Sequence, residues 1–286
     1  MKQEKWNGKS RGGSLGTWFF VVTLKYLGVR SAYALLTLVV PYFVFFAPKA
    51  RRAIWFYNRK IQHYGYFESI VKLFIHFYTF GQAIIDKIAL KHGISSYYTF
   101  DYGNYTEFLN VLDSGKGCII IGAHVGSWEV GTPYFREYGK NINIVMLDAE
   151  YNKIKSVIEE GAEKRDYKII PLGNDGLESI LRIKKALDDK EYVCLQGDRY
   201  MDESNSDELT FMGRKARFPR GLFVMCEKLR VPVVFYYAMR EKGGKYRFIF
   251  EVAGNDKPIR GKYIHSLEQI VKKYPQQWFN FYEFWE

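Results

Sequence analysis

From residue 105 to residue 252, short runs of β-branched and other apolar residues alternate with longer segments of helical periodicity. The predicted strands span residues 118–121, 142–147, 168–172, 192–196, 232–239 and 246–252. The predicted helices between them span residues 105–114, 127–138, 152–165, 176–188 and 220–229. Strands that alternate with helices form parallel sheets whose faces the helices cover. We therefore expect an α/β fold with a mostly parallel sheet, helices on both faces and an antiparallel edge.

The segments on either side of this pattern are rich in aromatic residues. Residues 51–92 carry them at spacings of three and four, so we expect a helical segment that packs mostly against the sheet. Residues 97–101 are expected to form a connection, and residues 269–285 a second aromatic helix, mostly in the core. Since composition does not change after residue 50, residues 51–286 are expected to form one domain.

The first predicted strand leads into a histidine and a carboxylate. Gly117 and Gly122 bound the strand, and His124 lies just past its end. Ser127 is a suitable helix N-cap, and Glu129 follows five positions after the histidine. Because reacting groups gather at the carboxyl ends of strands in open α/β sheets, Glu129 can orient the His124 imidazole as a general base. The backbone amides at 125–127, including those of Gly126 and Ser127, are candidate oxyanion donors.

This spacing alone has a simpler interpretation, which is a hydrogen-bonded histidine beside a capping serine. None of the other four histidines has an acid at this spacing within a strand-end turn, and we interpret them as structural or surface residues: His63, His76, His92 and His265.

Three blocks support the catalytic interpretation. His124 and Glu129 form an H-x4-E pattern, residues 211–221 read FMGRKARFPRG, and residues 275–278 read PQQW. In this order, they resemble the H-x4-E, F-x-G-x-x-A-x-x-P-x-G and P-x-Q-W segments of the late lipid A acyltransferases, the lauroyl and myristoyl transferases of Gram-negative bacteria. Glycerol phosphate acyltransferases carry H-x4-D and Phe-Pro-Glu-Gly-Thr, whereas this chain has Phe-Pro-Arg-Gly at 218–221.

The resemblance implies roles for further residues. The family places an aspartate at the strand end occupied here by Asp198, and a downstream arginine near the site, for which Arg165 is the nearest match. Asp198 would orient the acceptor, support His124 or cap a turn, and Arg165 has the alternative of a helix C-terminal charge. Four basic residues of the second block are expected to grip phosphates of the acceptor or donor, or to be solvated in a loop: Arg214, Lys215, Arg217 and Arg220. The acidic residues 201–208 are expected to form a mobile loop.

The N-terminal segment carries most of the net charge of +11. The first 60 residues hold eleven basic side chains and one acid, mixed with apolar runs at 15–24 and 31–48. As a helix, the charge-free 31–48 run would be about 27 Å long, close to the thickness of a hydrocarbon core. We expect residues 1–50 to anchor the chain to an anionic membrane, either as one long anchor or as an interfacial hairpin. A cleaved signal peptide is disfavoured because the apolar region is long and 47–50 is a poor cleavage site.

Other classes of function are less consistent with the sequence. No nucleic-acid-binding motif occurs, so we expect no nucleic-acid partner. Cys118, Cys194 and Cys226 lie in apolar runs, as small core residues of a reducing compartment do. No metal-binding or phosphate-loop pattern occurs, and we expect no metal and no cofactor.

The resemblance therefore implies a membrane-bound acyltransferase on the cytoplasmic face of a bacterial inner membrane, as Lys49, Arg51 and Arg52 after the apolar run also favour. It would move a fatty acyl chain from acyl carrier protein or acyl-CoA to a lipid A precursor. The alternatives are another acceptor (an amino-acid lipid, ornithine lipid or glycolipid) and a non-catalytic, membrane-anchored scaffold.

Overall fold

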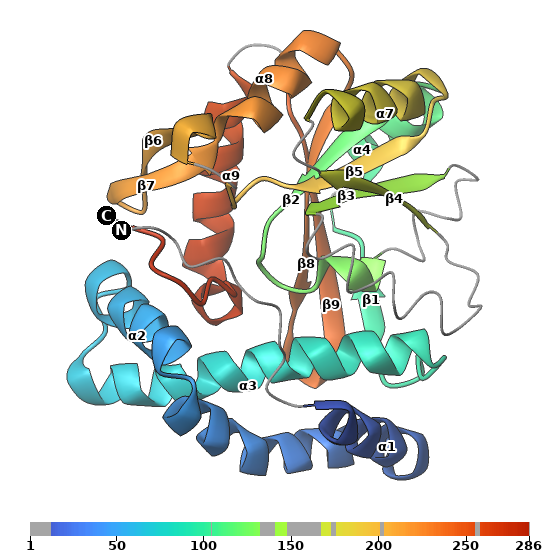
Figure 1. Ribbon diagram of the computed structural model, residues 1–286. Helices are drawn as coiled ribbons and strands as arrows, with labels where there is room; N and C mark the ends of the chain where they lie inside the picture. The colour runs from blue at the N-terminus through green and yellow to red at the C-terminus, as the bar shows by residue number, and fades with distance from the viewer. Residues whose placement is uncertain are drawn as a thin grey trace.

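The computed structural model describes residues 13–103, 105–131, 141–147, 167–172, 176–200, 203–254 and 258–285. It confirms the α/β fold, with a seven-stranded sheet in the order β1-β9-β8-β2-β5-β3-β4 (Figure 1). The strands are β1 (Thr99–Asp101), β2 (Cys118–Gly122), β3 (Ile142–Leu147), β4 (Tyr167–Leu172), β5 (Tyr192–Gln196), β8 (Val233–Arg240) and β9 (Lys245–Val252). Strands β8, β2, β5, β3 and β4 are parallel to one another, while β9 runs antiparallel to β8 and forms the predicted antiparallel edge with β1.

Helices cover both faces of the sheet because successive strand residues point to opposite sides. Ile119 and Ile121 of β2 belong to one apolar core, and Cys118 and Ile120 to the other. The first core is completed by α7 (Gly176–Asp188), α8 (Arg220–Leu229) and α9 (Ile259–Lys273). The second is completed by α1 (Gly13–Phe46), α3 (Tyr66–Lys91) and α4 (Thr106–Asp113).

The aromatic segments differ from the prediction in two places. Residues 51–92 are not one helix, because α2 (Pro48–Phe56) continues as a π-helical turn, Tyr57–Ile61, and breaks before α3. At the break, His63 has φ 56° and Gly65 is extended, which no continuous helix allows. Residues 97–101, predicted as a connection, include the short edge strand β1.

The prediction of a helix over residues 269–285 is wrong. Helix α9 ends at Lys273, and Pro275, which has no backbone N–H to donate, begins a short 3-10 turn, Pro275–Gln277. The following residues are extended: Trp278 forms an antiparallel bridge with Val125, and Trp285 forms one with Ala216. We call residues 275–285 the C-terminal strap. Of the predicted helix 127–138, the structure has a 3-10 turn at Trp128–Gly131, and the rest lies outside the described residues, as does 152–165.

The N-terminal apolar region forms α1, in which two helical segments meet at a break at Gly28, whose backbone is not helical (φ 79°, ψ 176°). Within it, Trp18–Phe46 is long and apolar enough to cross a membrane, by length and composition. The helix lies alongside α3 at the base of the molecule (Figure 1), and Val29, Ala32 and Leu36 are buried there. The predicted anchor is thus a helix that also packs on the domain.

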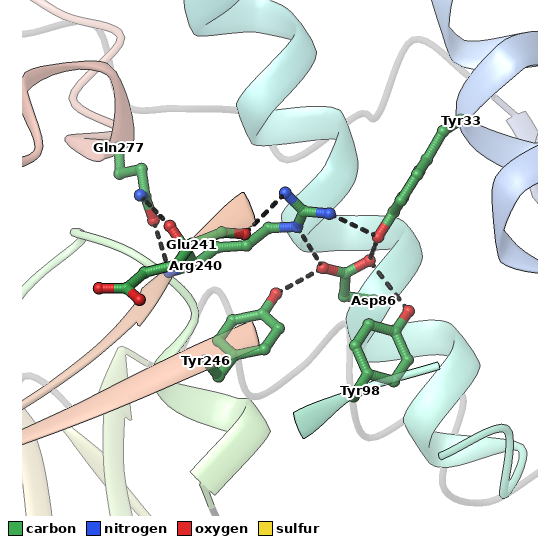
Figure 2. Close-up of polar contacts among 7 residues, drawn as sticks. All are labelled: Tyr33, Asp86, Tyr98, Arg240, Glu241, Tyr246 and Gln277. Carbon is green, nitrogen blue, oxygen red and sulfur yellow. Dashed lines mark hydrogen bonds and ion pairs between the residues drawn. The ribbon is translucent and has the colours of Figure 1, made fainter. Parts of the chain in front are cut away.

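A buried carboxylate joins α1, α3 and the sheet (Figure 2). Asp86 of α3 is fully buried and pairs with Arg240 at the end of β8, with 2.9 Å between Oδ2 and Nε. Its carboxylate also accepts hydrogen bonds from three phenols: Tyr33 of α1, Tyr98 and Tyr246. Arg240 in turn donates to the Tyr33 oxygen, at 3.1 Å. We call these five residues the Asp86 network. Because every member satisfies another, removing the carboxylate leaves a buried arginine without its counter-charge.

We predict that Asp86→Asn lowers the free energy of unfolding by about 3 kcal/mol, since the buried guanidinium of Arg240 loses its ion pair. The measurement is denaturant unfolding of the full chain in detergent. Asp188→Asn is the matched control, because its pair with Lys184 is exposed and should contribute less than about 0.5 kcal/mol. Equal losses in the two variants would contradict a stabilising role for the Asp86 network.

The middle of α3 holds the C-terminal strap through a second buried group. His76 is 1% exposed, and its Nε2–H donates to the Trp278 carbonyl at 2.8 Å. Its ring also contacts those of Tyr57, Phe279 and Phe281. Burial lowers the pKa of His76 from 6.5 to about 4, against the opposing effect of the bond to Trp278. The folded protein therefore keeps this imidazole neutral.

Because the folded-state pKa of His76 is depressed, the unfolded chain binds its proton first as pH falls. We predict that the free energy of unfolding decreases between pH 6.5 and pH 4, by on the order of 3 kcal/mol from this group. Unfolding titrations of the wild type and of His76→Phe, which fits the aromatic surroundings, should differ in slope over this range. The exposed His265→Gln serves as control. A slope unchanged in His76→Phe would show that another group causes the decrease.

Candidate active site

The predicted meeting point at the sheet edge is present. β2 and β5 pair in register so that Gly122 lies opposite Gln196, and both strands end there. His124 and Asp198 each follow two residues later. The Gly197 N–H and the Tyr263 hydroxyl both donate to the Gly122 carbonyl, at 3.0 and 2.9 Å. A Cβ on Gly197 would lie 2.7 Å from the Tyr263 ring, so glycine is required where the strand ends come together.

Asp198 binds His124 twice. Its Oδ1 accepts the Nδ1–H of the imidazole at 2.8 Å, and its Oδ2 accepts the backbone N–H of the same residue at 2.9 Å. The carboxylate is fully buried, while 26% of the imidazole surface is exposed. Burial alone would raise the pKa of Asp198, but the neighbouring His124 and Arg199 hold it at about 2. An ionised Asp198 fixes the Nδ1–H tautomer, which leaves the Nε2 lone pair to accept a proton.

Glu129, which the sequence suggested as the partner of the His124 imidazole, therefore does not bind Nδ1 of His124. It lies on the turn Trp128–Gly131, and its carboxylate pairs with Lys87 of α3. About a third of its side chain is exposed. The residue that orients His124 in this structure is Asp198, 74 positions away in the chain.

The backbone amides proposed as oxyanion donors are partly committed elsewhere. The Gly126 N–H donates to the Gln277 carbonyl, and the Ser127 N–H to the Ala238 carbonyl, both at 2.9 Å. Gly126 has φ 65°, and a Cβ there would lie 2.2 Å from the Ala238 oxygen, so its glycine serves close packing of the loop. Gly126 and Ser127 thus fix the loop in place, and in this structure their N–H groups are bonded to backbone carbonyls of the protein.

The C-terminal strap closes the site from the other side. The Phe279 N–H donates to the His124 carbonyl at 2.7 Å, and the Asn280 amide reaches Oδ2 of Asp198 at 3.4 Å. Arg199 binds the Phe279 carbonyl and the Asn280 side chain, both at 3.4 Å. Neither Arg199 nor Asn280 received a role from the sequence. Their positions directly after Asp198 and just after the P-x-Q-W block were the available signals.

The four basic residues of the second block belong to a β-hairpin and the start of α8. The hairpin consists of β6 (Ser206–Phe211) and β7 (Arg214–Pro219). Of the predicted mobile loop over 201–208, the last three residues belong to β6, Glu203–Asn205 form a 3-10 turn, and 201–202 lie outside the described residues. Lys215 pairs with Glu208 and Arg220 with Asp207, both at 2.6 Å. Arg214 lies over the Phe56 ring, and Arg217 stands opposite Glu208. Two of the four basic residues are thus paired with acids of β6, which weakens their predicted role in phosphate binding.

Two predictions about the site remain: the role of Arg165 and the expectation of no metal. Arg165 lies outside the described residues. Among the residues that the structure describes, no cluster of three or more His, Cys, Asp or Glu could hold a metal ion.

The arrangement suits proton transfer more than nucleophilic attack by the protein. Nε2 of His124 is a base held in one orientation at a partly open position. The thiols are poor candidates for a nucleophile: burial raises the pKa of Cys194, and that of Cys226 to about 12. The chemistry that fits is activation of an acceptor held outside the protein core.

Comparison with known proteins agrees with this chemistry. A search of curated proteins finds no match to the chain. The family model of the bacterial lipid A biosynthesis acyltransferases matches residues 75–286, which include His124, Asp198 and the C-terminal strap. Since this match covers most of the chain, the protein belongs to the bacterial lipid A biosynthesis acyltransferase family.

Proposed function

We propose that this acyltransferase moves a fatty acyl chain from acyl carrier protein or acyl-CoA to a hydroxyl of a lipid A precursor, at the cytoplasmic face of a bacterial inner membrane. The observation that carries the proposal is the His124–Asp198 pair, whose imidazole keeps Nε2 available at the sheet edge. Family membership supports the acyl transfer and the lipid A pathway. The apolar Trp18–Phe46 segment supports the membrane.

In the proposed reaction, Nε2 of His124 accepts the proton of the acceptor hydroxyl as its oxygen bonds to the thioester carbonyl carbon. Asp198 stabilises the resulting imidazolium through the Nδ1–H bond. When the tetrahedral intermediate collapses, the carbon–sulfur bond breaks and the imidazolium returns the proton to the departing thiolate. The acyl group passes directly to the acceptor, with no acyl-enzyme.

Glu129 remains our proposal for a second acid in the reaction. Its carboxylate is partly exposed and bound to Lys87, so it can change partners when substrate binds. Two roles are then distinguishable: a group that contacts the acceptor, or a group that only holds the turn to α3 through Lys87.

We predict that Asp198→Asn lowers kcat by roughly 10³-fold or more, because the amide no longer holds the productive tautomer of His124. Steady-state assays of the purified protein with an acyl-thioester donor measure this, with circular dichroism to check folding. Loss of activity below tenfold would assign Asp198 to folding alone.

Lys87→Met separates the two roles of Glu129. If Glu129 acts in the reaction, we expect Glu129→Gln to reduce kcat well beyond Lys87→Met, which leaves the carboxylate in place. Equal reductions in the two variants would instead show that the Lys87–Glu129 pair matters only for the position of the turn.

The proposed acceptor is tested by mass spectrometry of the host's lipids. We expect lipid A to lack one acyl chain in both a deletion strain and a His124→Ala strain that retains the folded protein. The mass difference identifies the chain. If lipid A is unchanged but another acylated lipid is lost, that lipid identifies a different acceptor. If no lipid changes in either strain, the acyltransferase proposal is contradicted.

A further inference from the structure

Helix α1 is built into the domain along one of its faces. Its buried side chains include Val29, Ala32, Leu36 and Val40, at helical spacings of three and four. Where α1 meets α3, Gly81 allows close approach, because a Cβ on it would lie 2.5 Å from a methyl carbon of Leu36. The contact is therefore specific and close, unlike that of a helix tethered beside the domain.

A polar contact fixes the same face. Tyr33 of α1 is bonded to Asp86 of α3 and to Arg240 of β8 (Figure 2). If α1 moved away from the domain, the buried carboxylate and guanidinium would each lose a partner, at the cost of leaving polar groups unsatisfied. Helix α1 and helix α3 must therefore take the same position relative to a membrane.

Helix α3 is not suited to hydrocarbon along its whole length. Lys87 is half exposed and paired with Glu129, and Lys91 and His92 are exposed at the helix end. The strands of the sheet stand above α3 in the view of Figure 1. If α1 spanned a bilayer, it would bring these charged groups to membrane depth, where they are strongly disfavoured.

The outer face of α1 is apolar, and the start of α3 also exposes apolar side chains. Leu38 is 77% exposed and Phe67 of α3 is 82% exposed. We define the docking face as Leu38, Tyr42, Phe45, Phe46, Phe67 and Val71, all of them exposed. Phe67 and Val71 lie five helical turns before Ile85 and Ala89, on the side of α3 that is buried there. This side of α3 is uncovered at the start of the helix, because there the chain has already turned from α1 into α2.

Basic residues lie before and after the charge-free run 31–48, which begins just past the break of α1 at Gly28. Lys25 and Arg30 are exposed before it, and Lys49 and Arg52 after it. A spanning helix is expected to carry such charges mainly at one end, whereas a helix lying in the plane of an anionic surface places both ends among headgroups. Basic residues on both sides of the run are thus explained by an interfacial position.

We propose that α1 lies in the plane of an anionic lipid surface and that Phe67 and Val71 insert beside it, so that the protein docks by this face without crossing the bilayer. The inference rests on the proposed function only in taking a membrane as the place of reaction. Both ends of α1 then stand on the same side of the bilayer as His124.

A labelling experiment on the full chain tests the topology. Ser10→Cys places a thiol before α1, and Asp189→Cys places one at the exposed end of α7, far from α1 (Figure 1). In spheroplasts of the host, a membrane-impermeant maleimide should label neither variant above wild-type background, and should label both after lysis. Labelling of Ser10→Cys in intact spheroplasts, with Asp189→Cys protected, would show a span and overturn the proposal.

Vesicle binding tests the contribution of α3. Phe67→Ser/Val71→Ser should weaken partition of the protein onto vesicles of phosphatidylethanolamine and phosphatidylglycerol by about tenfold, because two inserted side chains are lost. The matched control is Leu177→Ser/Leu181→Ser, an exposed apolar pair at the same spacing on α7, which should bind as wild type. Equal partition of the two double variants would overturn the docking face.

An assay in detergent separates this inference from the proposed function. The Phe67→Ser/Val71→Ser variant should retain wild-type turnover on detergent-solubilised substrates while it binds vesicles weakly. If it instead binds vesicles normally and loses turnover, these side chains line an acyl-chain groove and the docking proposal fails. If the wild type binds vesicles as expected but transfers no acyl group, the proposed function fails and the docking face stands.

Discussion

The buried pair of Asp86 and Arg240 is the interaction on which the arrangement of this molecule depends. It joins a helix from the N-terminal part of the chain to a strand 154 positions later. Three tyrosine hydroxyls complete the carboxylate's bonding, and one of them, from Tyr33, brings in α1 (Figure 2). A charge pair in an apolar interior is tolerated only when its hydrogen-bonding capacity is satisfied. The network therefore specifies one relative position for α1, α3 and the sheet.

The same network continues to the catalytic loop through the backbone. Arg240 exchanges two hydrogen bonds with the side chain of Gln277, at 2.9 and 2.7 Å. The carbonyl of Gln277 accepts the Gly126 N–H, and the next strap residues bond to the loop at His124. The His124 imidazole is thus held by Asp198, and the backbone of His124 by the strap. A displacement of α3 would therefore shift His124 through these contacts, even without a bound ligand.

The sequence predicted the six strands of the alternating pattern, the helices at 105–114, 176–188 and 220–229, and the position of His124 and Asp198 at strand ends, because each depends on local periodicity. The sequence did not predict which acid binds the His124 imidazole. Glu129 is five residues from His124, yet the register of β2 and β5 places Asp198 at Nδ1. Asp86 gives no sign in the sequence, since one acid in an amphipathic helix usually faces solvent. The strap read as a helix because its aromatic residues are dense, whereas their burial comes from contacts with α3 and β7 that periodicity does not encode.

Helix α3 connects the parts of the protein that must work together. Its first turns expose Phe67 and Val71, its middle binds the strap through His76, and its last turns carry Asp86 and Lys87. A lipid surface that holds the first turns consequently fixes the depth at which the site stands above the membrane. In the proposed function, an amphipathic acceptor would enter such a site from the side, with its acyl chains still in the lipid. His124 is held rigidly by Asp198, whereas Glu129 is more exposed. In the proposed function, the acid that can change partners is therefore the one that faces α3.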